Sequence, residues 1–83
     1  MDTREIENEV RRYLLEELNL PAEELGRDAR LVRNGLLDSV NLVQVATHLE
    51  RTFGIEVPDQ DIDGEHLDSI AMIASYVEAR QRS

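Results

Sequence analysis

The 83 residues suffice for one compact domain spanning 1–83, and 18 acidic against 9 basic residues give a formal net charge of −9. Such an acidic chain repels phosphate backbones and anionic lipid, so we expect neither nucleic-acid binding nor membrane insertion. The absence of cysteine excludes disulfides and thiolate metal sites, and the charged N-terminus does not resemble a signal peptide, so we expect a cytoplasmic protein.

The first predicted element is an amphipathic helix, which Asp2 or Thr3 can cap. Apolar residues recur in it every four positions and define the face that we expect to be buried. These residues are Ile6, Val10, Leu14 and Leu18. Asn19 and Pro21 close the helix, since proline cannot continue its hydrogen bonds.

A long connection follows from residue 20 to residue 38 and contains Pro21, Gly26 and Gly35. A connection of this length is unusual inside a compact domain. Five leucines are spread along it, more than a disordered linker would carry. We therefore expect the segment to lie across the helices and to be held there by these side chains. They are Leu20, Leu25, Leu31, Leu36 and Leu37.

The clearest helix is predicted from Ser39 to Phe53, because apolar residues recur there at steps of three and four. Gly54 ends it in the position that favours glycine. Ile55 and Val57 then resemble two apolar anchors of an extended link.

A short helical turn over 59–62 and a last helix beginning near Asp68 or Ser69 complete the prediction. The core face of the last helix is predicted to consist of Ile70, Ile73, Ala74 and Val77. The predicted fold is all-α, a small bundle of three main helices and one short helix with a long first loop.

Ser39 is predicted to open the second helix, directly after Gly35-Leu36-Leu37-Asp38. The N-terminus of a helix exposes N–H groups and favours negative charge, so a phosphodiester attached at Ser39 would be stabilised there. Asp38 is a good N-cap for the same helix. An Asp-Ser pair at a helix start is most often only a cap, so the pair does not identify a function by itself.

The stretch 36–62 resembles the acyl carrier protein family, which includes peptidyl and D-alanyl carriers. The matching residues are Asp38-Ser39-Val40, Phe53-Gly54-Ile55 and Val57-Pro58-Asp59. The predicted helices and the long loop also fall where that family has them, so the resemblance covers nearly the whole chain and implies an acyl-carrier-like bundle.

The resemblance implies that a phosphopantetheinyl transferase attaches 4′-phosphopantetheine to Ser39 and that the arm carries a thioester-bound acyl or aminoacyl group. The chain would then be a monomeric carrier and not an enzyme. It would move cargo between a loading adenylate-forming ligase and a downstream acyl-accepting enzyme. Val40 and Val43 are candidate partner contacts beside the arm, or else edge residues of the core.

Two departures from fatty-acid-type carriers favour a stand-alone carrier of the aminoacyl or D-alanyl type. The glycine before the serine is Gly35, one position further back than in the fatty-acid type. The second helix has Glu50 as its only acid, where fatty-acid carriers have several. We therefore expect a dedicated ligase, which loads an amino acid or a short acid.

A second Asp-Ser pair, Asp68-Ser69, lacks the preceding glycine loop, and we interpret both residues as a capping pair for the last helix. His48 follows Ser39 by nine residues, about 13 Å along a helix and half a turn out of phase, so it cannot activate that hydroxyl. We expect His48 and His66 at the surface.

Residues 59–64 reproduce the first half of an EF-hand calcium loop, with glycine in sixth place, and the full twelve positions would be 59–70. Ile70 stands where a bidentate glutamate is required, so we do not expect a calcium site. The alternatives to a carrier are a non-carrier helical interaction module and an EF-hand-like divalent-cation binder at 59–70, and the sequence does not decide whether the acids of 59–68 bind divalent cations.

Overall fold

The structure, a computed structural model, describes residues 2–82 as three α-helices and two short 3-10 helices. In chain order these are α1 (Thr3–Glu16), η1 (Ala22–Glu24), α2 (Ser39–Phe53), η2 (Asp59–Asp61) and α3 (Ile70–Arg82). Residues 2–82 contain no strand and no helix long and apolar enough to cross a membrane. The predicted all-α bundle is confirmed, and η1 is an additional turn that the sequence did not predict.

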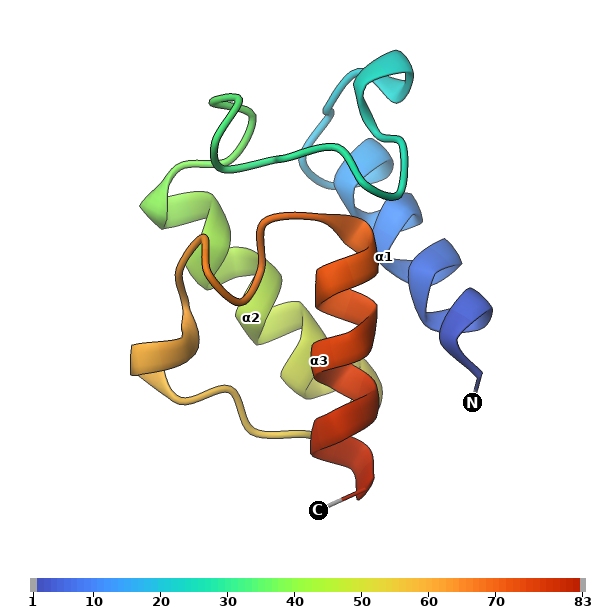
Figure 1. Cartoon of the computed structure of the whole chain (residues 1–83), viewed down its shortest axis with the longest axis vertical. Helices are drawn as coiled ribbons and strands as arrows, with labels where there is room; N and C mark the ends of the chain where they lie inside the picture. Colours follow the sequence, from blue (N-terminus) through green and yellow to red (C-terminus); the bar gives the residue numbers. More distant parts are fainter. Residues whose placement is uncertain (1, 83) are drawn as a thin grey trace.

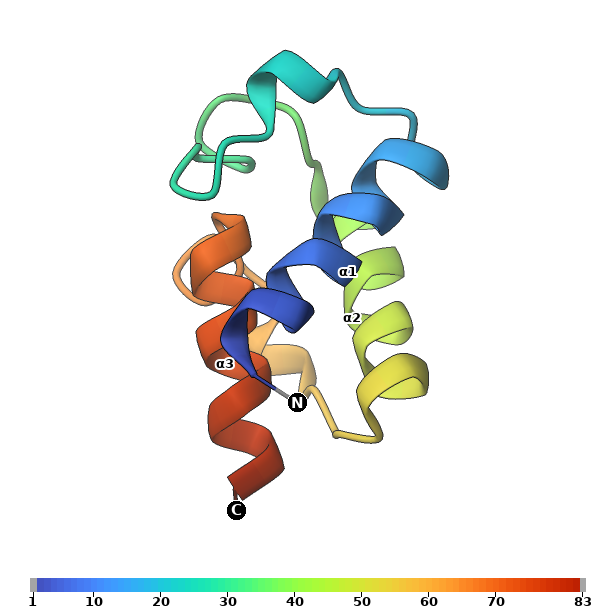
Figure 2. The ribbon, with the colours of Figure 1, turned by 90° about the vertical axis from the view of Figure 1, so that its right-hand side faces the viewer.

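The long connection between α1 and α2 covers one end of the bundle, where α1 ends and α2 and α3 begin (Figures 1 and 2). Leu25, Leu31 and Leu37 are at most 2% exposed, and Leu20 and Leu36 are partly buried against the same core. Burying one leucine contributes about 1.5–3 kcal/mol. The prediction that leucines hold this loop on the helices is confirmed.

The three predicted helix faces form the centre of the core. Its members from the helices are Ile6, Val10 and Leu14 of α1, Leu42, Val45, Ala46 and Leu49 of α2, and Ile70, Ile73, Ala74 and Val77 of α3. Ile55 and Val57, the predicted anchors of the link after α2, are also buried. The last helix therefore has the core face that its periodicity predicts.

Helix α1 is capped by Asp2, whose side chain accepts a hydrogen bond of 2.9 Å from the Glu5 N–H. The helix ends at Glu16, before Leu18, and Leu18 is only partly buried. Asn19 has a left-handed backbone with φ of 56°, a conformation that asparagine tolerates better than most residues. The helix thus ends two residues before the apolar stripe does, ahead of the left-handed turn at Asn19.

Asp68 attaches the long loop to the start of α3. Its carboxylate Oδ1 accepts hydrogen bonds from the N–H groups of Val32, at 2.7 Å, and Arg33, at 3.2 Å. Its backbone carbonyl accepts another from the Leu31 N–H at 2.6 Å. Asp68 is only 3% exposed, so these bonds replace the water that a carboxylate normally requires.

The prediction that Asp68 and Ser69 cap α3 together is wrong for Asp68. Ser69 caps the helix, since its Oγ accepts from the Met72 N–H at 3.1 Å and its carbonyl accepts from the Ile73 N–H. The Ser69 hydroxyl thus occupies the capping position, and the chain before it turns the Asp68 carboxylate toward the loop.

The Asp63 carboxylate closes the turn before α3. Asp63 Oδ1 accepts hydrogen bonds from the Glu65 and His66 N–H groups, both at 3.0 Å, and lies 2.8 Å from His66 Nδ1. This hydrogen bond raises the pKa of His66 and lowers the pKa of Asp63. The His66 ring also meets the Tyr76 ring edge-on. The His66 side chain is 39% exposed and therefore lies at the surface.

We expect Asp68→Ala to lower the free energy of unfolding by about 2–3 kcal/mol, because two N–H groups of the loop lose their acceptor. Urea denaturation of the unmodified chain measures this loss. Asp28→Ala is the matched control, since the Asp28 side chain is 81% exposed and its pairing with Arg27 is a surface contact. Equal losses in the two variants would contradict the role of Asp68.

The contact between His66 and Asp63 predicts a pH-dependent contribution to stability. Because folding raises the pKa of His66, the contribution is complete below pH 6.5, the unfolded value, and is lost as the pH rises through the folded value. His66→Gln should therefore cost more at pH 5.5 than at pH 8.5 in urea titrations. In an Asp63→Asn background this pH dependence should shrink, and an unchanged dependence would disprove the pairing.

Candidate functional site

Ser39 is the first residue of α2, and its side chain is exposed. Asp38 is the N-cap, because its carboxylate accepts from the Asn41 N–H at 2.8 Å. The Asn41 side chain accepts in return from the Asp38 N–H at 3.4 Å, which completes a reciprocal capping box. The cap is thus made without the Ser39 hydroxyl, which is directed to solvent.

The turn before α2 is fixed by one carbonyl and one glycine. The Leu31 carbonyl accepts from the N–H groups of both Leu36, at 2.8 Å, and Leu37, at 3.0 Å. Gly35 has φ of 81°, a left-handed conformation that strains residues with a side chain. Leu37 is 2% exposed, so a buried anchor lies two residues before the exposed serine.

The N-terminus of α2 suits an anionic group at Ser39. The first turn contains no acidic residue, and within residues 2–82 the N–H groups of Ser39 and Val40 have no acceptor. Such N–H groups and the helix dipole favour negative charge. An attached phosphodiester would therefore fit this site, with the Ser39 oxygen as its anchor.

Val40 and Val43 are 66% and 53% exposed, and they are the large apolar side chains that the described chain leaves exposed. They are three residues apart and hence neighbours on one face of α2. This exposure excludes the alternative that they are edge residues of the core. An exposed apolar patch is typical of a surface that contacts other proteins.

The serine of the second Asp-Ser pair has a different environment. Ser69 is 3% exposed, and its hydroxyl is used in the cap of α3. A transferase could not reach it without unfolding the start of that helix. The structure therefore leaves Ser39 as the accessible serine of the two pairs.

Three of the five acids of 59–68 are engaged with other groups of the protein. Asp61 accepts from the Tyr76 hydroxyl at 2.6 Å, Asp63 binds His66, and Asp68 binds the long loop. In the part of the chain that the structure describes, no three histidine or acidic residues could hold a metal ion together.

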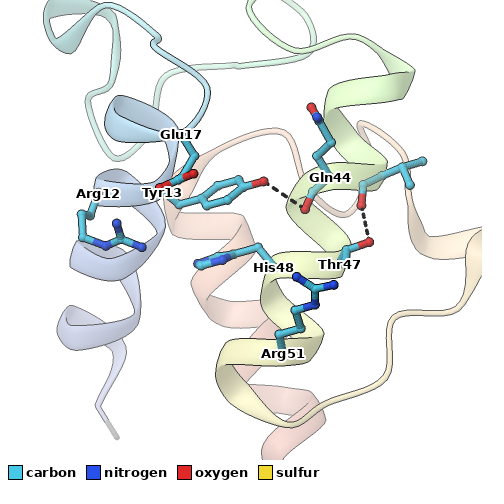
Figure 3. Close-up of a pocket in the computed structure, with 8 residues that line it drawn as sticks. Arg12, Tyr13, Glu17, Gln44, Thr47, His48 and Arg51 are labelled. Atoms are coloured by element: carbon cyan, nitrogen blue, oxygen red, sulfur yellow. Dashed lines mark hydrogen bonds between the residues drawn. The ribbon is translucent and has the colours of Figure 1, made fainter.

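A cleft of about 430 Å³ between α1 and α2 was not predicted from the sequence (Figure 3). Tyr13 of α1 stacks on His48 of α2 at 4.0 Å between ring centroids, and His48 Nε2 lies 2.9 Å from a carboxylate oxygen of Glu9. The His48 side chain is only 17% exposed, so the prediction that it is a surface residue is wrong. In the sequence, the one feature that could have indicated this cleft is the position of Tyr13 beside the apolar stripe of α1.

Comparison with known proteins agrees with this geometry. Residues 8–77 match the family model described as the phosphopantetheine attachment site. The chain is 31% identical over 81 residues to the acyl carrier protein of Akkermansia muciniphila, which covers 98% of this chain and 99% of that protein. The acyl carrier protein of Campylobacter hominis is 32% identical over 74 residues, which cover 89% of this chain and 91% of that protein. The acyl carrier protein of Helicobacter hepaticus is 30% identical over 81 residues, which cover 98% of this chain and 100% of that protein.

These matches extend over nearly the full length of the chain and agree with the all-helical fold. Members of the family carry covalently attached 4′-phosphopantetheine and are carriers rather than enzymes. The chain therefore belongs to the acyl carrier protein family of phosphopantetheine-bearing carriers.

Proposed function

We propose that Ser39 bears the 4′-phosphopantetheine arm and that the chain carries a thioester-bound acyl or aminoacyl group. The observation that supports this assignment is the exposed Ser39 at the first turn of α2, which Asp38 caps and where the N–H groups of Ser39 and Val40 have no acceptor within residues 2–82. When bound, the arm supplies the thiol that holds the cargo. The protein supplies the anchor, N–H groups that favour the phosphodiester by about 0.3–1 kcal/mol, and a surface for partner enzymes.

The surface of α2 supports loading by a dedicated adenylate-forming ligase, with transfer to a separate acceptor enzyme. Glu50 is the only acid of α2, and its carboxylate is engaged with the Val57 N–H at 2.9 Å. The exposed part of the helix near Ser39 is therefore apolar and uncharged rather than acidic. Partner enzymes would recognise the exposed side chains of Val40 and Val43 by apolar contact. We propose further that the carrier is a monomer and that loading and transfer of the acyl group take place in the cytoplasm.

We expect a broad-specificity phosphopantetheinyl transferase with coenzyme A to add one arm to the unmodified chain, detected as a single increment in intact mass. Ser39→Ala should gain nothing. Ser69→Ala, the matched control, should still gain one arm if circular dichroism shows that it is folded. An arm on Ser39→Ala, or a folded wild-type chain that stays bare, would disprove the assignment and leave a helical interaction module.

The exposed valines predict an effect on the same reaction. Val40→Gln and Val43→Gln should each lower the kcat/KM of arm transfer about tenfold, which corresponds to about 1.4 kcal/mol of lost apolar contact with the transferase. Stability should change by less than about 0.5 kcal/mol, because both side chains are exposed. Thr52→Gln, at the exposed far end of α2, should leave kcat/KM unchanged. Unchanged rates in both valine variants would contradict the contact.

A further inference from the structure

Asp68 is a buried charged residue that takes no part in the anchor at Ser39. It is 3% exposed, its Oδ1 lies 2.7 Å from the Val32 nitrogen and 3.2 Å from the Arg33 nitrogen, and Arg30 lies 3.7 Å from Oδ2. A carboxylate withdrawn from water destabilises the fold unless it has such partners. An apolar side chain could fill the same space, but it could not accept hydrogen bonds from both N–H groups.

The hydrogen bonds continue from Asp68 to the turn before Ser39. The Asp68 carbonyl accepts from the Leu31 N–H at 2.6 Å, and the Leu31 carbonyl accepts from the N–H groups of Leu36, at 2.8 Å, and Leu37, at 3.0 Å. Leu37 is buried and lies two residues before Ser39. The backbone that leads into Ser39 is therefore attached to the start of α3 through Asp68.

Helix α2 has supports that do not involve Asp68. Its N-terminus is capped by the reciprocal pair of Asp38 and Asn41, and its core face is buried. Loss of the Asp68 contacts should therefore leave the helix and its exposed apolar surface in place. It should release the turn over 31–36, through which the chain reaches Ser39.

Arm transfer requires the Ser39 oxygen at a defined position. This oxygen forms a bond to the phosphorus next to pantetheine, the pyrophosphate bond of coenzyme A at that phosphorus breaks, and adenosine 3′,5′-bisphosphate leaves. The hydroxyl proton passes to a base of the transferase. Misplacement of a reacting group by about 1 Å can lower a rate about a hundredfold. Movement of the turn before Ser39 therefore lowers kcat, whereas contacts to the surface of α2 determine KM when chemistry is slow.

We propose that Asp68 is a positioning residue for attachment of the arm, and that its carboxylate fixes the turn before α2 so that the Ser39 hydroxyl is presented to the transferase. The proposal rests on the carrier function proposed above and adds a residue that acts on Ser39 through the long loop. Two N–H groups converge on one oxygen of Asp68, so the requirement is for an acceptor at that place and not for a negative charge.

Three substitutions separate the position of the acceptor from its charge. Asp68→Asn keeps an oxygen in the same place, and its kcat for arm transfer should stay within about twofold of wild type. Asp68→Glu keeps the charge but displaces the acceptor by one methylene, and Asp68→Ala removes the acceptor. We expect kcat to fall at least about threefold in Asp68→Glu and about tenfold in Asp68→Ala, with the KM for the carrier within about twofold.

Val77→Ala is the control for lost stability, because Val77 is buried in the core face of α3, about two turns beyond its start. Its kcat should equal that of wild type under conditions in which circular dichroism shows the variants to be folded. If Asp68→Ala does not fold, the Asn and Glu variants still decide between position and charge.

Amide hydrogen exchange of the unmodified chain gives a readout that does not depend on the transferase. Exchange at Leu36 and Leu37, relative to exchange at the buried Leu49 of α2, should be at least about tenfold faster in Asp68→Ala and Asp68→Glu than in wild type. The same ratio should not rise in Asp68→Asn or Val77→Ala.

The outcomes separate the two proposals. A folded wild-type chain that gains no arm would overturn the carrier assignment and this inference together. If the chain gains the arm, the inference alone is overturned when Asp68→Ala and Asp68→Glu keep the wild-type kcat, or when Asp68→Asn falls as far as Asp68→Ala. An equal fall in Val77→Ala, or unaltered exchange at Leu36 and Leu37 in Asp68→Ala, would overturn it as well.

Discussion

The attachment of the long loop to α3 through Asp68 is the constraint on which the site depends. Its carboxylate and carbonyl together accept three N–H groups of residues 31–33, and Arg30 lies 3.7 Å from the other carboxylate oxygen. This contact fixes Leu31, whose carbonyl in turn fixes Leu36 and Leu37. The position of Ser39 therefore follows from a residue 29 positions later in the chain. A buried carboxylate destabilises the folded state unless its oxygens are hydrogen-bonded or paired. The loop therefore has to adopt the one arrangement that supplies these donors to Asp68.

Helix α2 has three faces with different surroundings. Leu42, Val45 and Leu49 face the core, Val40 and Val43 face solvent beside Ser39, and Thr47, His48 and Arg51 face α1. One helix thereby links the exposed serine to an exposed apolar surface and to the cleft with α1. The repeat of about 3.6 residues per turn fixes the angular relation among these three surfaces, and the buried core face fixes the orientation of the helix in the bundle.

The sequence predicts what depends on local order. The bounds of α2, its Gly54 ending and the buried faces follow from periodicity and capping preferences, which act over a few residues. The role of Asp68 and the stacking of His48 on Tyr13 were not predicted, because each joins residues more than 30 positions apart. Exposure of Val40 and Val43 was also undecided, since an apolar residue at the edge of a helical face is compatible with either environment until the neighbours are placed.

The two Asp-Ser pairs show why a motif must be aligned with the helix before it is interpreted. At α2, Asp38 is the N-cap and Ser39 the first helical residue, so the carboxylate accepts the free N–H and the hydroxyl points outward. At α3 the frame is shifted by one, so Ser69 is the N-cap and its hydroxyl accepts the Met72 N–H. The same dipeptide thus yields an accessible nucleophile at one helix and a buried cap at the other. Since a side chain in the capping position is committed to the backbone, only the serine that follows the cap is available for modification.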